Sequence, residues 1–169
     1  MQEGVFAAKM KSQGYEKSKD DLEMGMTEYC YKSKTTGSYL SVSYGTRSNG
    51  YFVRSVSIAK DFKNPDLPTI KKTFLDYGKQ CTNLKAEFKK GEINGVNGSN
   101  TRLRVKNSAD WISKCLPELD RFVNAKQPGN AYQDYDDAGY SYSVSFSHSL
   151  GLTYIVVSIT DLTVNDNRG

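Results

Sequence analysis

Large apolar side chains and serine alternate four times in succession over Tyr140–Ser147. A period of two residues is typical of a β-strand that buries one face and keeps the other in water. We therefore predict a strand over 140–149 that forms a hairpin with a second strand over 152–161. The side expected beneath helices holds Tyr140, Tyr142, Val144 and Phe146, and the wet side holds Ser141, Ser143, Ser145 and Ser147, joined by Ser41 and Ser43 of an earlier strand.

The N-terminal part of the chain is predicted to form a short helix over 3–13 and then three strands over 22–33, 38–45 and 50–60. The last two strands are separated by Arg47-Ser48-Asn49-Gly50, whose Asn-Gly pair suits a tight hairpin turn. Strands joined by such a turn run antiparallel, so this region is expected to be an antiparallel meander.

The clearest helical pattern covers 67–90, directly after Asn64-Pro65-Asp66. Apolar residues recur there every three or four positions, which predicts one stripe facing the sheet. Gly91 is expected to end the helix. The stripe holds Ile70, Phe74, Tyr77, Cys81, Leu84 and Phe88, and the opposite side holds Lys71, Lys72, Lys79, Lys85 and Lys89.

The following segment is predicted to contain a loop over 92–100 and a short strand over 101–106, with Leu103 and Val105 inward. A second helical region begins near Ser108, and Pro117 should kink or split it. The Gly-, Tyr- and Asp-rich stretch 127–139 is interpreted as a long exposed loop.

These elements predict one α+β domain over 1–169, in the order α-βββ-α-β-α-ββ. The expected architecture is an antiparallel sheet of about five to six strands with two longer helices packed on one face.

Composition supports a folded domain with a thin core. The mean hydropathy is −0.62, which is low, but 12 tyrosines argue against disorder, and the net charge is only +4. No apolar run approaches the roughly 20 residues of a transmembrane segment. Residues 1–4 resemble no signal peptide, so such a peptide is either absent or already removed.

Three widely spaced cysteines, Cys30, Cys81 and Cys115, and a single histidine make a zinc site improbable on spacing alone. The cysteines are interpreted either as three buried, inert thiols or as one disulfide with one thiol left over. If a disulfide forms, Cys81–Cys115 is expected, because both lie on apolar helix faces. Together with the abundant Tyr, Ser and Asn, this favours a periplasmic or secreted location over the cytoplasm.

Catalytic patterns do not fit the sequence. Ser147 and Ser149 flank His148 on a strand, where neighbouring side chains point to opposite faces, and Cys30 shares its predicted side with apolar residues. The acidic residues of 127–139 lack the EF-hand spacing. We therefore predict a protein that is not an enzyme, with no catalytic residues, no metal and no cofactor.

The remaining positive feature is a surface of tyrosine, serine and arginine, residue types that are common where proteins recognise one another. The sequence thus predicts a protein-binding protein of the inhibitor, immunity or adaptor type. The alternatives are a nucleic-acid or polyanion-binding module that uses the lysine side of helix 67–90 and the Arg102 strand, and, third, a small-molecule enzyme. The candidate contacts are Tyr29, Tyr31, Arg102 and Arg104 on the sheet, and Tyr132, Asp134, Tyr135, Asp136 and Asp137 in the acidic loop.

Overall fold

The computed structural model describes residues 1–17, 28–35, 39–62, 66–95, 102–124 and 126–164. These residues form an α+β fold with antiparallel strands, as predicted, but with nine strands rather than five to six. The helices are α1 (Glu3–Ser12), α2 (Leu67–Asn83) and a broken helical segment that starts at α3 (Ser108–Asp110) and ends at α4 (Leu119–Asn124). The strands are β1 (Tyr15–Lys17), β2 (Glu28–Ser33), β3 (Tyr39–Arg47), β4 (Gly50–Phe62), β5 (Glu87–Gly95), β6 (Arg102–Val105), β7 (Gly129–Asp136), β8 (Tyr140–Ser149) and β9 (Leu152–Asp161).

The chain divides into two compact units. Unit 1 is Met1–Ala59 with Ser158–Gly169, and unit 2 is Lys60–Val157. Within unit 1 the strand order is β1-β2-β3-β4, and within unit 2 it is β9-β8-β7-β5-β6. Each unit has its own cluster of buried apolar residues. The expectation of one domain over 1–169 stays a prediction.

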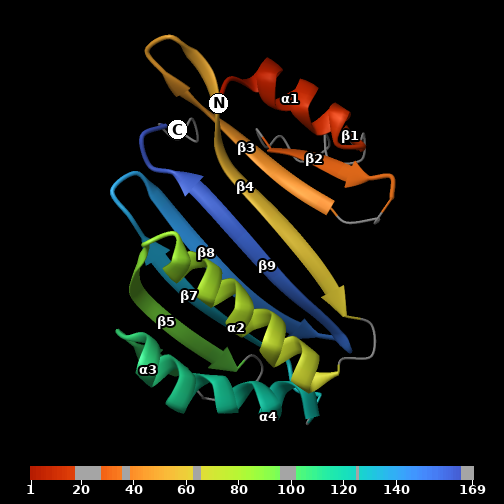
Figure 1. Cartoon of the computed structure of the whole chain (residues 1–169). Helices are drawn as coiled ribbons and strands as arrows, with labels where there is room; N and C mark the ends of the chain where they lie inside the picture. The colour runs from red at the N-terminus through yellow and green to blue at the C-terminus, as the bar shows by residue number, and fades with distance from the viewer. Residues whose placement is uncertain (18–27, 36–38, 63–65, 96–101, 125, 165–169) are drawn as a thin grey trace. The chain divides into compact units, whose positions relative to one another are not determined.

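Unit 1 confirms the antiparallel meander over its described residues, whereas residues 22–27 of the predicted first strand lie outside them. Its β3–β4 hairpin closes with Arg47 opposite Gly50, at the turn that the Asn-Gly pair indicated. Helix α1 covers one side of these strands and contributes Phe6 and Met10 to the core of the unit (Figure 1). The ring of Phe6 meets the ring of Tyr31 edge-on, with 5.9 Å between the ring centroids.

In unit 2, helix α2 buries Ile70, Phe74 and Cys81 in the core, which confirms most of the predicted stripe. The carboxylate of Asp66 caps the helix by accepting a hydrogen bond from the Thr69 amide, and a proline follows in the first turn.

The predicted helix 67–90 is too long. Helix α2 ends at Asn83, Lys85 adopts a left-handed φ of 62°, and residues 87–95 form strand β5. Leu84 is 54% exposed instead of facing the core. The error has a physical reason: Phe88 packs against the core from strand β5, so its spacing fits the helical pattern by coincidence.

The prediction of an exposed loop over 127–139 is also wrong for most of these residues. Residues 129–136 form strand β7, which pairs with β5 on one side and β8 on the other. Its side chains alternate between buried and half-buried. Glycine, asparagine and aspartate are poor strand formers, but pairing on both edges overrides that weak local preference.

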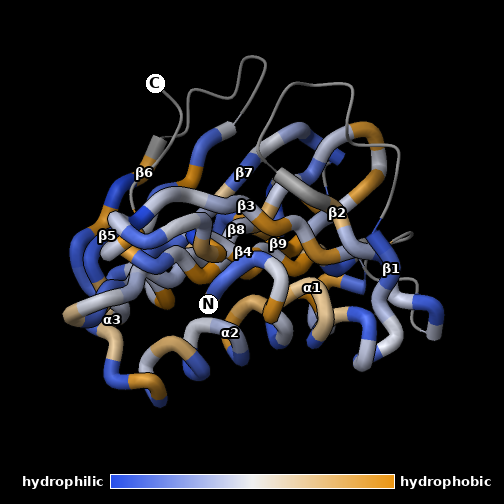
Figure 2. The backbone as a smooth tube through the Cα atoms, turned by 90° about the horizontal axis from the view of Figure 1, so that it is seen from above, coloured by the Kyte–Doolittle hydropathy of each residue, from blue (hydrophilic) through white to orange (hydrophobic). Residues whose placement is uncertain are grey.

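The alternating strand is confirmed. Tyr142, Val144 and Phe146 of β8 are buried, whereas Tyr140 at the start of the strand is 45% exposed. The second helical region is split, as Pro117 indicated: α3 is followed by a π-helical turn over Trp111–Cys115, a 3-10 turn over Leu116–Glu118, and α4. Helices α2 and α3 lie on the same side of the unit 2 strands (Figure 2).

Candidate functional site

The face of unit 2 that lies opposite its helices is polar, and strand register arranges its side chains in rows. One row crosses four strands, with Arg104 of β6 opposite Glu92 of β5, Glu92 opposite Tyr132 of β7, and Tyr132 opposite Ser145 of β8. Directly opposite side chains on one face of a sheet lie within contact distance. We call this surface the polar face. It comprises Lys90, Glu92, Asn94, Arg104, Asn130, Tyr132, Asp134, Asp136, Ser141, Ser143, Ser145 and Ser147.

Glu92 lies at the centre of the polar face and is 5% exposed. Its Oε2 accepts hydrogen bonds from Arg104 Nε at 2.7 Å and from the Tyr132 hydroxyl at 3.3 Å. Its Oε1 accepts one from Asn94 Nδ2 at 2.9 Å. The hydrogen bond to Glu92 raises the pKa of Arg104. A buried carboxylate with several donors is satisfied, and it holds the arginine in one place.

A second set of charges lies beside Tyr132. Lys90 Nζ is 5.5 Å from the centre of the Tyr132 ring and 3.5 Å from Asp134 Oδ2. The side chains of Lys90 and Arg104 are 52% and 57% exposed, whereas those of Asp134 and Glu92 are 22% and 6% exposed. The cations of this face are therefore more accessible to solvent than the carboxylates that hold them.

The serine side of β8 completes the polar face. Ser141, Ser143 and Ser145 are half-buried, and Ser147 is exposed. Ser145 Oγ donates a hydrogen bond to the Val156 carbonyl oxygen at 3.4 Å. Small hydroxyl side chains can both donate and accept, so this side supplies adaptable hydrogen-bonding groups next to the charged rows.

The structure brings Arg104, Tyr132, Asp134 and Asp136 together on the polar face, although the sequence placed the last three in a loop. Arg102 lies on the same strand as Arg104, opposite Asn94, and its side chain is outside the described residues.

The other predicted contacts lie elsewhere. Tyr135 is 4% exposed on the helix side of β7, against Phe88, and burial raises its pKa to about 12. Tyr31 is 4% exposed in the core of unit 1. Tyr29 pairs with Val42 through its backbone, and its side chain is outside the described residues. Neither Tyr31 nor Tyr135 is available as a surface contact.

The carboxylate of Asp137 is held by three hydrogen bonds within the turn between β7 and β8. It accepts hydrogen bonds from the amides of Gly139 and Tyr140 and from the Tyr142 hydroxyl, each at 2.8 Å. These bonds, the Gly139 amide first, hold the pKa of Asp137 below its usual value. Asp137 thus closes the β7–β8 turn, which explains an acidic residue at this position.

Lys90, Glu92 and Asn94 are site residues that the sequence analysis missed, because it assigned them to a helix end and a loop. They alternate with Gly91 and Ile93, which are buried. This short period of two was the available signal, and it was hidden by the helical spacing that Phe88 appeared to continue.

The nucleophilic and basic groups considered from the sequence are buried. His148 is 2% exposed, its Nδ1 lies 2.7 Å from the Thr153 hydroxyl oxygen, and burial lowers its pKa. The Cys81–Cys115 disulfide, expected only if a disulfide forms, is not present in the described part of the chain; both residues are buried free thiols in the core of unit 2, which was the other interpretation. Burial raises the pKa of Cys81, and raises that of Cys115 to about 11, so both favour the unreactive thiol form. Among the described residues, no group of acidic, cysteine or histidine side chains is arranged to hold a metal ion.

The lysine side of the predicted helix is largely paired. Lys71 forms an ion pair with Asp120, Lys72 with Asp76 at 2.6 Å, and Lys89, now on β5, with Glu87 at 3.4 Å. Such pairing reduces the net positive charge that this side offers to a polyanion.

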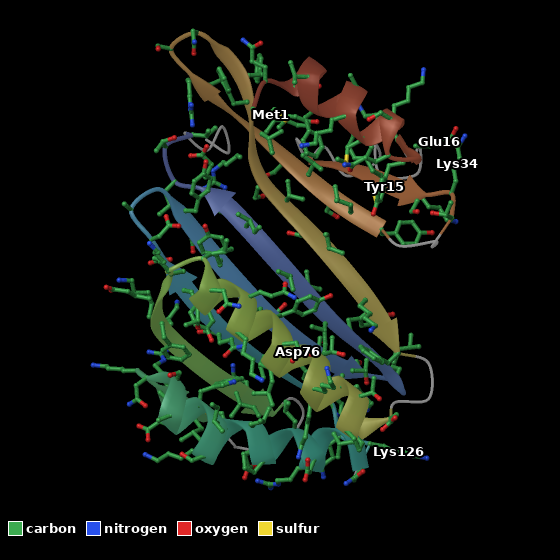
Figure 3. The ribbon with its side chains drawn as sticks, in the orientation of Figure 1. Met1, Tyr15, Glu16, Lys34, Asp76 and Lys126 are labelled. Carbon is green, nitrogen blue, oxygen red and sulfur yellow. The ribbon has the colours of Figure 1, made fainter. Side chains whose placement is uncertain are left out.

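Unit 1 holds a cavity of about 690 Å³ lined by residues of α1, β1 and β2. Tyr15, Glu16 and Lys34 lie at this end of the unit (Figure 3), and Glu16 Oε1 is 2.6 Å from Lys34 Nζ. Both charged side chains are mostly exposed, so this ion pair contributes little to stability. The lining carries charges of both signs and therefore indicates no one class of ligand.

Comparisons with protein-family models, with curated proteins and with solved structures found no match to this chain. Within the described residues, no helix combines the length and the apolar composition that a bilayer crossing requires.

Proposed function

We propose that the protein binds another protein through the polar face of unit 2, in the manner of an inhibitor, immunity factor or adaptor. The observation that carries this proposal is the set of hydrogen bonds by which buried Glu92 holds Arg104 and Tyr132. Ordering a long side chain on binding costs conformational entropy, and an arginine that is already held loses less of it.

The residue types of the polar face support the same function. Arginine and tyrosine are enriched among the residues that contribute most to binding between proteins, and serine adds adaptable hydrogen bonds. Arg104 and Lys90 are more exposed than the carboxylates that hold them, so the part of the partner surface that meets these two cations is proposed to be acidic. Complementary charge of this kind favours specificity and fast association.

A photo-crosslinking experiment tests the proposal. A photoreactive amino acid at Ser147, which is exposed on the polar face, should capture one protein from a lysate of the source organism, and the same label at Ser113, exposed on the helical segment, should not. The captured protein is then purified and its affinity measured directly.

Two arginine variants sharpen this test. Arg104→Ser should weaken binding of the purified partner at least tenfold, which corresponds to about 1.4 kcal/mol. The matched control is Arg121→Ser, because Arg121 is similarly exposed and also binds a glutamate, Glu118, at 2.7 Å. Equal binding by both variants, or capture from both label positions, would contradict the proposal.

A polyanion-binding function is the second candidate, and Lys90 and Arg104 support it. Duplex DNA binding would weaken steeply with salt, since each neutralised phosphate contributes a slope of about −0.9 in a log–log plot. A titration of fluorescent duplex and single strands at several salt concentrations separates the two functions. We expect binding no tighter than the micromolar range typical of non-specific contacts.

A further inference from the structure

Unit 2 contains a small pocket on its helix side, between α2 and the π-helical turn, with strand β7 at its floor. Its volume is about 230 Å³, and it is lined by α2 residues that include Gly78, Lys79 and Asn83, by Trp111, and by Gln133 and Tyr135 of β7. We call it the α2 pocket. Gln133 and Tyr135 alternate along β7 with Tyr132 and Asp134, so the pocket opens on the side opposite the polar face.

The floor of the α2 pocket presents a polar group with unused donors. Gln133 is 2% exposed, and its Oε1 accepts a hydrogen bond from the Tyr135 hydroxyl at 3.0 Å. Within the described residues, Gln133 Nε2 makes no hydrogen bond, although it faces the pocket-lining Gly78. This amide group can therefore donate to a ligand in the pocket.

Trp111 forms another part of the pocket lining. It is 1% exposed, and its Nε1 has no hydrogen-bond partner among the described residues. The opposite edge of the indole, Cε3 and Cζ3, packs against Gly91. Trp111 also begins the π-helical turn, a local distortion that occurs frequently at functional sites.

Gly78 lets helix α2 pack closely on the floor of the pocket. A Cβ atom at this position would lie 2.7 Å from Gln133 Nε2 and 3.0 Å from the Tyr135 hydroxyl oxygen. Helix α2 can approach the β7 floor this closely only because residue 78 has no side chain. A glycine within a helix interior is unfavourable, so a close approach of this kind gives its position a physical reason.

The charges that line the α2 pocket indicate which class of ligand it would bind. Lys79 is the charged residue among those that line the pocket, and no carboxylate lines it. Among the described residues Lys79 makes no ion pair, although the pKa of nearby Asp76 is lowered mainly by Lys72 and to a smaller extent by the charge of Lys79. Lys79 and the amide of Gln133 both belong to the pocket lining, and together they match a negatively charged oxygen acceptor.

We propose that the α2 pocket binds a small carboxylate of about amino-acid size. The pocket is smaller than the roughly 300–1,000 Å³ of sites for drug-sized ligands, which limits the occupant to a few heavy atoms. The carboxylate accepts from Gln133 Nε2 and pairs with Lys79. This site is independent of the polar face, and binding of a protein partner is not required for it.

The test uses the single tryptophan of the chain, Trp111, as the reporter. Purified protein is titrated with sodium propionate, with sodium chloride at equal ionic strength, and with propionamide, the neutral analogue of similar shape. Tryptophan fluorescence and the indole N–H resonance are followed. We expect a saturable change with propionate alone. A change that is linear, or that chloride or propionamide reproduces, would overturn the proposal.

Substitutions in helix α2 test whether propionate binds in the α2 pocket. Lys79→Met should raise the dissociation constant for propionate at least tenfold, whereas Lys72→Met, a matched change on the same helix outside the lining, should leave it within twofold. Gly78→Ala should abolish the saturable change by displacing Gln133 and Tyr135 from the pocket floor. If Gly78→Ala does not fold, the comparison of the two lysine variants decides the matter, and equal dissociation constants for them would overturn the proposal.

Discussion

At the scale of single residues, the most informative side chains of unit 2 are polar groups in buried positions. Glu92 is almost completely buried and accepts hydrogen bonds from three side chains, while His148 is buried with one hydroxyl partner. A buried polar group stabilises a fold only while its partners remain in place. Replacing Glu92, or protonating His148, should therefore lower the stability of the fold measurably.

Replacing Glu92 by alanine should lower the free energy of unfolding by about 1–3 kcal/mol, because the Tyr132 hydroxyl and the Asn94 amide lose their acceptor. Urea denaturation measures this change. The control is Glu118→Ala, which removes the partner of Arg121 in a surface ion pair and should alter stability by less than about 0.5 kcal/mol. Equal effects would show that Glu92 contributes no more than a surface residue.

The pH dependence of stability should report on His148, the one histidine of the chain. Burial lowers the pKa of His148 below its ordinary value of 6.5, so the unfolded chain binds a proton more readily than the folded protein. Stability is thus complete above pH 6.5 and falls as pH decreases from there towards the lower folded-state pKa. Melting temperatures measured from pH 7.5 to pH 5.5 should decrease for the native protein.

The corresponding control is His148→Gln, which cannot titrate in this range. Its melting temperature should change much less between pH 7.5 and pH 5.5, because carboxylates titrate mainly below this interval. A parallel decrease in both proteins would mean that other groups cause the pH dependence.

At the scale of elements, helix α2 shows how far a periodic pattern can be followed. Its stripe is real from Ile70 to Cys81, where the helix packs on the sheet. Beyond Asn83 the same spacing continues through Leu84 and Phe88, but the chain turns and becomes strand β5. The helix and the strand bury apolar residues in the same core, so one pattern spans two elements.

Phe74 is the strongest test of this packing. It is fully buried, and its ring stacks on that of Trp111 with 5.5 Å between centroids. Phe74→Ala should lower the free energy of unfolding by about 3–5 kcal/mol through lost burial and the cavity left behind. Leu84→Ala, a large apolar residue just past the helix end, should cost less than about 0.5 kcal/mol. Chemical denaturation of both variants gives the comparison, and similar values would refute the assigned helix boundary.

At the scale of the whole molecule, the described chain has two clusters of buried apolar residues, one in each unit. Cys81 and Cys115 come from different helical segments but belong to the same cluster in unit 2, whereas Cys30 lies on β2 of unit 1. The cysteines are therefore natural reporters of the core of unit 2, and Cys30 is a reference outside it.

Thiol labelling across a urea titration should expose Cys81 and Cys115 at the same denaturant concentration, because one core protects both. Mass spectrometry of the labelled peptides measures each position separately. Labelling of Cys81 well before Cys115 would show that α2 leaves the core independently of the second helical segment.

The sequence by itself determined the elements whose pattern is local. The alternation of β8, the α2 stripe up to Cys81, the break at Pro117 and the β3–β4 turn depend on spacing and on residues such as proline and glycine. Side-chain direction in a helix or a strand follows from that spacing alone, so these features could be predicted without knowledge of neighbouring strands.

Only the tertiary structure decided that residues 129–136 form a strand and that Glu92 is buried beneath Arg104 and Tyr132. Glycine, asparagine and aspartate favour loops locally, and the hydrogen bonds that make β7 a strand come from β5 and β8, which lie elsewhere in the sequence. The polar face and the α2 pocket therefore arise from cross-strand register and helix packing. The alternation of Lys90, Glu92 and Asn94 with buried residues was visible in the sequence, but the contacts between distant strands that assemble these surfaces were not.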